Sequence, residues 1–255
     1  MNEAPAAIQD VCAICKQLAV LRKSHIVPAF IARWIKKDAP GTVFVNTETG
    51  YASQDISKMH LFCDDCEQRF PAYEGEFRNG VFDAHFKRRV NFSRGEYLTR
   101  FATSLAFRVA LATLPAVRID PPERLGRVHA MMELWRQYLL SPPETPSPSE
   151  HELFILNGRN VVPPPDISPE LTAKYLIETI DPSIVASSDV VGVYCKLPSM
   201  LIWSPIEPTD RTGWRGTRVS GTGTIRAQKQ VVTAAPFTQL FHERLRIIAA
   251  KRGLS

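Results

Sequence analysis

The chain of 255 residues lacks any apolar run close to the ~18 residues that a membrane-spanning helix needs. Its first eleven residues also lack a cationic segment followed by an apolar core, which is the pattern of a secretory signal. Both absences lead us to expect a cytoplasmic protein with no membrane partner.

Several fingerprints of enzyme families are missing as well. The sequence has no nucleophile elbow, no P-loop, no glycine-rich dinucleotide fingerprint and no internal repeat. This disfavours an enzyme whose site lies in the C-terminal part, with the N-terminal part serving only as a clip. A net charge of +5 permits an anionic partner such as nucleic acid but does not require one.

Cysteine is scarce, and its distribution is informative. Four of the five cysteines form two Cys-x-x-Cys pairs, Cys12 with Cys15 and Cys63 with Cys66, whereas Cys195 stands alone in an apolar run. Two such pairs supply the four thiolates of a closed tetrahedral zinc site. In a reducing compartment paired cysteines are more often metal ligands than disulfides, although a redox or packing role stays open. We therefore predict structural Zn²⁺ on these four residues and a buried, small apolar role for Cys195.

Helix signals are spread along the chain. Apolar residues at helical spacing follow Pro28, and a further helix should follow Cys66. The clearest helix should run to Leu114 and a second one to about Leu140, each opened by a capping box. The boxes are Ser93-x-x-Glu96 and Asp120-x-x-Glu123. Later helices should begin near Ser168 and Pro236.

Residues 141–150 are rich in proline and should form a loop, and the sequence after them is rich in β-prone residues. The predicted strands cover 151–156, 190–195, 200–203 and 219–232. We expect an α+β fold with two parts: a zinc-bound module of the treble-clef or ββα-metal type over 1–91, and a mixed helical and β-rich domain over 92–255.

The first third of the chain resembles a known family. The order of its motifs is similar to that found in zinc-containing HNH endonucleases of the His-Me finger class. These motifs are a first Cys-x-x-Cys, then Ser24-His25-Ile26-Val27-Pro28, and then Leu61-Phe62-Cys63-Asp64-Asp65-Cys66. The resemblance implies a ββα unit that holds one catalytic divalent cation, Mg²⁺ or Mn²⁺. It also implies that His25 is the general base that activates water for attack on a DNA phosphodiester.

That chemistry is reasonable for these residue types. Histidine has a pKa near neutrality, which suits a general base, and a divalent cation neutralises charge on the scissile phosphate. Glu67 stands directly after the last cysteine, where the family usually has histidine, and its carboxylate is a good ligand for Mg²⁺ or Mn²⁺. Glu74, two turns further along the same helix face, could assist.

The sequence also departs from the family pattern. Ser24 occupies a position where the family often has an acidic residue or histidine, and no asparagine stands at 57–60. His25 could instead bind zinc or form a structural hydrogen bond. Glu67 could be a helix N-terminal acid, and Glu74 an ordinary solvated residue.

A mixed basic and aromatic stretch follows the second cysteine pair. Within it we predict that Lys87, Arg88 and Arg89 contact a nucleic-acid backbone, with an amphipathic connector as the alternative. Arg108 lies inside an apolar helix and should pair with a buried carboxylate.

These observations favour a metal-dependent DNA endonuclease, or the nuclease subunit of a bacterial or phage restriction or antiviral defence system. Residues 92–255 would then bind a protein partner or a second copy of the chain. The alternative is a catalytically inactive zinc finger that binds DNA or protein.

Overall fold

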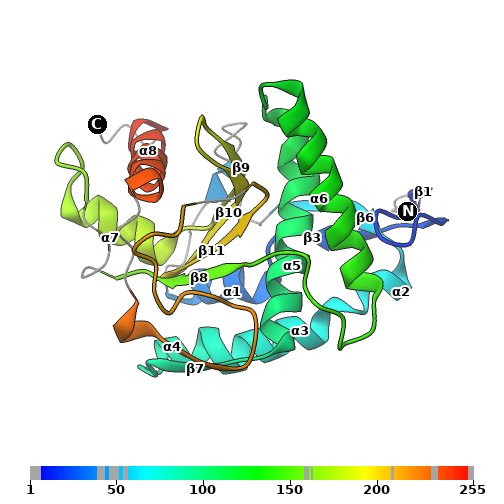
Figure 1. Ribbon diagram of the computed structural model, residues 1–255, viewed down its shortest axis with the longest axis horizontal. Coiled ribbons are helices and arrows are strands. Elements are labelled where there is room, and N and C mark those ends of the chain that lie inside the picture. Colours follow the sequence, from blue (N-terminus) through cyan, green and yellow to red (C-terminus); the bar gives the residue numbers. More distant parts are fainter. Residues whose placement is uncertain are drawn as a thin grey trace, which may run out of the picture.

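The computed structural model describes residues 7–38, 44–45, 52–53, 57–157, 161, 163–207, 210–230 and 235–251. Figure 1 shows a mixed α+β fold in which long helices lie beside an antiparallel sheet. The α+β fold class is thereby confirmed.

The N-terminal third combines short hairpins with helices. β1 pairs with β2, β3 with β6, and β4 with β5, each antiparallel. Helix α2 directly follows β6, so two paired strands and a helix occur in the order that the resemblance implies. The elements are β1 (Gln9–Val11), β2 (Leu18–Val20), β3 (Arg22–His25), α1 (Ala29–Asp38), β4 (Phe44–Val45), β5 (Ala52–Ser53), β6 (Lys58–Phe62), α2 (Asp64–Glu67), α3 (Phe70–Phe77), the π-helical turn η1 (Arg78–Phe82) and α4 (Asp83–Phe86).

The remainder of the chain forms the larger sheet and its covering helices. Four antiparallel strands follow the order β8-β11-β10-β9, and a separate small pair joins β7 to β12. The elements are β7 (Asn91–Arg94), α5 (Glu96–Thr113), η2 (Leu114–Ala116), α6 (Pro122–Leu140), β8 (Glu152–Ile155), α7 (Pro169–Glu178), β9 (Asp181–Ala186), β10 (Val191–Leu197), β11 (Met200–Pro205), β12 (Gly223–Arg226), η3 (Ala227–Lys229) and α8 (Ala235–Lys251).

Both faces of the four-stranded sheet are buried, and alternate residues serve different cores. Leu153 and Ile155 belong to the large core that includes α5, whereas Phe154 packs with Tyr175 of α7 and Phe241 of α8. Successive side chains of a strand point to opposite faces, so this alternation follows directly from the strand geometry. The sheet is therefore a middle layer with α5 on one face and α7 and α8 on the other.

Helix α5 is the central element of the molecule. It contacts α3, α6 and three strands of the sheet, and nearly all of its side chains are buried. Phe101 of α5 stacks on Phe77 of α3 with 3.8 Å between ring centroids. One continuous core thus extends from the first cysteine pair to the sheet. It crosses the predicted domain boundary near residue 91, and the division into two domains stays a prediction.

The predicted helices occur close to their expected starts, but the predicted side-chain caps were correct at one site and wrong at two. Ser168 caps α7 by accepting a hydrogen bond from the Leu171 backbone N–H at 3.1 Å. Neither predicted capping box forms: Gly95 is the N-cap of α5 and Pro121 that of α6. Ser93 instead pairs with Thr224 in the β7–β12 ladder, so a strand contact replaces the local cap.

The predicted strands over 151–156, 190–195 and 200–203 are confirmed as β8, β10 and β11. Strand β9, which contains Pro182, was not predicted. It lies at the sheet edge, where a missing N–H is tolerated. Of the stretch predicted as strand over 219–232, only β12 is a strand, η3 follows it directly, and the last two residues lie outside the described ranges. As predicted, no helix or strand falls in 141–150.

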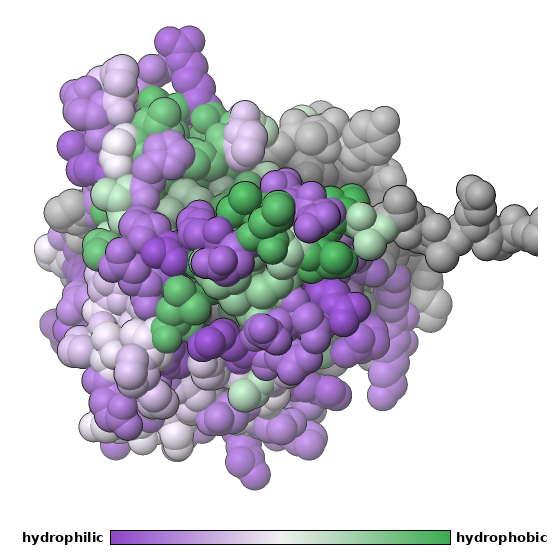
Figure 2. Space-filling view, turned by 90° about the vertical axis from the view of Figure 1, so that its right-hand side faces the viewer, coloured by the Kyte–Doolittle hydropathy of each residue, from purple (hydrophilic) through white to green (hydrophobic). Residues whose placement is uncertain are grey.

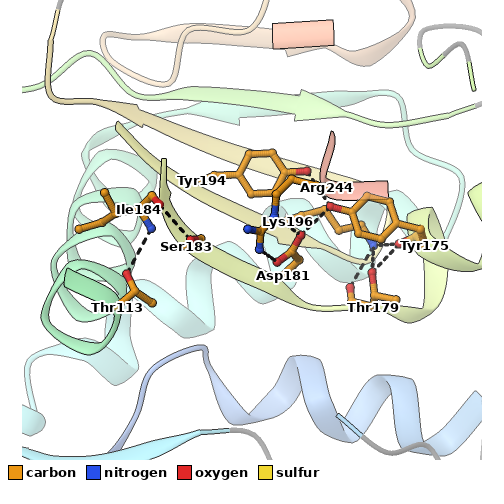
Figure 3. Close-up of polar contacts among 9 residues, drawn as sticks. All are labelled: Thr113, Tyr175, Thr179, Asp181, Ser183, Ile184, Tyr194, Lys196 and Arg244. Carbon is orange, nitrogen blue, oxygen red and sulfur yellow. Dashed lines mark hydrogen bonds and ion pairs between the residues drawn. The ribbon is translucent and has the colours of Figure 1, made fainter. Parts of the chain in front are cut away.

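A buried polar cluster joins α7, α8 and the sheet (Figure 3). Asp181 of β9 pairs with Arg244 of α8, at 3.0 Å from the arginine Nε, and accepts a hydrogen bond from the Tyr175 hydroxyl at 2.8 Å. Lys196 of β10 donates to the backbone oxygens of Tyr175 and Thr179 and to the Thr179 hydroxyl. Because buried charges are costly without partners, this cluster fixes how α7 and α8 sit on the sheet.

None of the described helices is both long and apolar enough to cross a membrane, in line with the absence of a long apolar run.

His151 allows a prediction about stability. Its ring is fully buried between the hydroxyls of Thr103 and Ser204, at 2.8 and 2.7 Å. Burial, aided by the charge of Arg211, lowers the pKa of His151 to about 3. In the unfolded chain its pKa is about 6.5. Between these values the unfolded state binds the extra proton, so stability falls as the pH drops from about 6.5 to 3.

The total loss from this group is about 5 kcal/mol. Urea unfolding at pH 7.5, 5.5 and 4.5 of the natural chain and of His151→Gln measures it. The amount by which the free energy of unfolding of the natural chain exceeds that of His151→Gln should decrease as the pH falls. A difference that is independent of pH would contradict this assignment.

Candidate metal centre

The two cysteine pairs converge from opposite ends of the N-terminal third. Cys12 and Cys15 lie in the turn between β1 and β2, whereas Cys63 is the N-cap of α2 and Cys66 lies within it. Their four Sγ atoms all lie within 4.8 Å of one another. The distance between the Sγ atoms of Cys15 and Cys63 is 3.8 Å. A tetrahedron with Zn–S bonds of ~2.3 Å has edges of about 3.8 Å.

Backbone contacts hold the two pairs together. The Cys63 N–H donates to the Cys12 Sγ at 3.4 Å, and the Ala13 N–H donates to the Leu61 carbonyl at 2.9 Å. Burial alone would raise the pKa of Cys12, but hydrogen bonds from the Cys63, Cys15 and Ile14 backbone prevail and lower it to about 7. This thiol is therefore prepared to become a thiolate, the form that binds metal.

The opposite holds for Cys66, where burial and the neighbouring thiols raise the pKa. Four thiolates this close repel one another unless a cation lies among them. The donor set, its geometry and its charge thus fit a bound metal ion such as zinc. Cys195 lies apart from this cluster, buried in the sheet as predicted.

Next to the cysteines, the end of β3 meets helix α2. Ser24 is fully buried, and its hydroxyl donates to Glu67 Oε2 at 2.5 Å. Glu67 is half-buried, as is His25, which follows Ser24 at the end of the strand. Glu67 therefore contacts Ser24, the residue directly before His25 in β3, and we call this junction of β3 and α2 the corner.

Arg108 supports this corner from the central helix α5. Its guanidinium donates to the backbone carbonyl of His25 at 3.1 Å and pairs with Glu74 of α3 at 2.9 Å. It also lies 5.0 Å from the centroid of the Phe70 ring. The expected carboxylate partner of Arg108 is thus Glu74, which is half-buried, and Glu74 is a paired residue rather than an ordinary solvated one.

Sequence reasoning found that Arg108 needs a partner but not that it contacts His25. The two residues are 83 positions apart, and the arginine within an apolar helix was the only local signal. His60, on the neighbouring strand β6, is exposed.

The predicted nucleic-acid contacts lie on a different segment, where α4 ends. Lys87, Arg88 and Arg89 are all exposed. The β7–β12 pair brings Arg226 opposite Asn91, and the Ala227 N–H donates to the Val90 carbonyl at 2.8 Å. Arg226 and Lys229 are also exposed and were missed, because more than 130 residues separate them from the first three. We call these five residues the basic surface.

Among the described residues, no ion pair involves any side chain of the basic surface. Their five positive charges are therefore open to an anionic partner.

An apolar area marks the face that carries the β1–β2 hairpin. Figure 2 shows this face, with hydrophobic surface set among hydrophilic residues. Val11 and Leu18 oppose each other across the hairpin and are 52% and 66% exposed, and Val20 is 54% exposed. Apolar surface of this kind is typical of protein contacts, and here it lies on the N-terminal module.

Removing one thiol should release the metal. We expect the natural chain, purified without chelator, to carry about one zinc per chain by elemental analysis. Cys66→Ser should lose it and melt at lower temperature, whereas the matched control Cys195→Ala should retain the metal. Equal metal content in both variants would show that the four thiols do not form the site.

Comparison with protein family models, with curated proteins and with solved structures found no match to the chain.

Proposed function

We propose that this protein is a metal-dependent DNA endonuclease of the HNH type, built on a treble-clef module that zinc holds together. The observation that supports this best is the contact between Ser24, which directly precedes His25 in the chain, and Glu67, which directly follows the last of the four clustered thiols. The bacterial or phage defence role, and a partner bound through residues 92–255, belong to the same proposal.

In this proposal zinc has a structural role. The turn between β1 and β2 and the start of α2 are about fifty residues apart, and one ion on Cys12, Cys15, Cys63 and Cys66 would join them. Since β3 follows the first pair and α2 contains the last cysteine, the same ion fixes the distance between His25 and Glu67.

The chain's own residues would then divide the hydrolysis between them. His25 accepts a proton from the attacking water through its imidazole. Ser24 donates to Oε2 of Glu67 and keeps the carboxylate oriented. The other carboxylate oxygen of Glu67 would then bind Mg²⁺ or Mn²⁺. The cation, when bound, stabilises charge on the phosphate and on the leaving oxygen. Arg108 keeps the His25 backbone and Glu74 in place.

The basic surface would position the DNA. Lysine and arginine neutralise phosphates without reading sequence, so these contacts would set the register of the substrate and not its specificity.

A specific observation also favours the alternative of a non-catalytic DNA- or protein-binding finger. Ser24 already hydrogen-bonds Glu67, and Glu74 is already paired with Arg108, so few carboxylate oxygens in this corner remain for a cation. The asparagine of the family pattern is also absent from 57–60.

Nicking of supercoiled plasmid separates the two functions. With Mg²⁺ or Mn²⁺ we expect the natural chain to nick, His25→Ala to lose at least about a hundredfold in rate, and Glu67→Gln to require more metal. His60→Ala, an exposed histidine on the neighbouring strand, is the matched control and should nick normally. Absence of nicking at normal zinc content would support the binding module instead.

DNA affinity should depend on salt through the basic surface. Each phosphate contact contributes about −0.9 to the slope of log affinity against log salt. Arg88→Ala and Arg226→Ala should each make the slope shallower by about 1, measured by fluorescence anisotropy with a labelled duplex. Lys174→Ala on α7 is the control for a lost charge elsewhere. Unchanged slopes in the first two variants would exclude this surface from DNA binding.

A further inference from the structure

A cavity lies where the first cysteine pair meets the two long helices, away from the residues of the proposed cleavage corner. Its volume is about 410 Å³, within the range of small-molecule sites. Apolar side chains form most of its lining, among them Phe107 and Leu111 of α5, Leu114 of η2 and Met132 of α6. This part of the cavity suits the hydrocarbon body of a ligand.

Polar residues join the lining from two elements. Lys16 comes from the turn that contains Cys12 and Cys15, and His129, Glu133 and Arg136 come from α6. Arg136 donates to the Ile14 carbonyl at 2.7 Å, so it connects α6 directly to the cysteine turn. The Lys16 backbone N–H donates to the Cys12 carbonyl at 3.0 Å, which fixes the position of the lysine on that turn.

The charges around the cavity do not cancel. Arg136 binds both carboxylate oxygens of Glu133, with Nε···Oε2 at 2.7 Å and Nη2···Oε1 at 2.6 Å. Hydrogen bonds from Arg136 and Gln137 lower the pKa of Glu133 to about 2, so this pair stays ionised and is neutral as a unit. Lys16, which is exposed and forms no ion pair among the described residues, is therefore the cation of the lining that remains for an anionic group.

We propose that this cavity binds a free small organic acid: an aromatic or aliphatic body of up to about two rings that carries one anionic group. The body would lie against Phe107, Leu111 and Met132, and the anion would face Lys16. A neutral hydrocarbon would make no polar contact with Lys16, and a polyanion would be repelled by Glu133 and by the neighbouring thiolates. This site is independent of the proposed nuclease function.

Because Lys16 belongs to the turn that the cysteines hold, the ligand would contact the metal-binding turn directly. Binding would therefore stabilise the arrangement of Cys12 and Cys15, and loss of the metal would weaken binding.

Calorimetric titration of the full, metal-loaded chain with 2-naphthoate tests the proposal. We expect saturable binding of one equivalent, and binding of the neutral analogue 2-naphthalenemethanol that is weaker by at least about fivefold. Lys16→Glu should weaken naphthoate binding by about tenfold and leave the neutral analogue almost unaffected. Lys87→Glu, a charge reversal on the basic surface, is the matched control.

Filling the cavity provides the second arm. Leu111→Trp should abolish binding of both compounds. If this variant does not fold, Leu114→Trp, on a different element, serves in its place. Circular dichroism and zinc content check that each variant retains its fold. Absence of saturable binding, equal affinity for both compounds, or binding that survives the tryptophan would each overturn the proposal. Plasmid nicking has no part in this readout, so failure here leaves the nuclease proposal standing.

Discussion

The convergence of four cysteine thiols is the constraint on which the N-terminal structure depends. Their Sγ atoms lie within 4.8 Å of one another, although the two pairs are about fifty residues apart in the chain. The donor set and its spacing fit a metal ion, and a cation among the four sulfurs would offset the repulsion between them as thiolates. The turn between β1 and β2, strand β6 and the first turn of α2 all meet at this point.

Two features of the first third lie next to that cluster, the contact between Ser24 and Glu67 and the cavity bordered by Lys16. Ser24 contacts Glu67 because β3 and α2 each lie next to a cysteine pair. Lys16 borders the cavity near α6 because it belongs to the first cysteine turn. A single cation-binding cluster would thus border two distinct places: the proposed cleavage corner, and the proposed ligand cavity, whose lining apart from Lys16 comes from α5, α6 and the segment between them.

Helix α5 connects this module to the rest of the protein. Its phenylalanine and leucine side chains pack in the common core, while Arg108 reaches the backbone of His25 and the carboxylate of Glu74. Removing the charge of either Arg108 or Glu74 would leave the other poorly compensated in a largely buried place. The position of the corner is therefore determined by the second part of the chain as well as by the cysteines.

Local patterns in the sequence were sufficient for much of the architecture. Helical periodicity identified α5 and α6, β-prone runs identified β8, β10 and β11, and the cysteine spacing identified the four-thiol cluster. These features depend on residues close together in the chain, or on a spacing that has few alternative explanations. The capping box at Ser93 failed for the converse reason, because a strand from residues 223–226 competes for the segment and prevails.

The sequence by itself therefore determined the α+β class, most of the elements and the set of thiols. Only the tertiary structure decided that Glu67 bonds Ser24, that Arg108 holds Glu74 and His25, and that Arg226 joins the basic surface of Lys87 to Arg89. The physical reason is that periodicity and spacing report on neighbours along the chain. Contacts between side chains many residues apart depend on how whole elements pack, which no local pattern specifies.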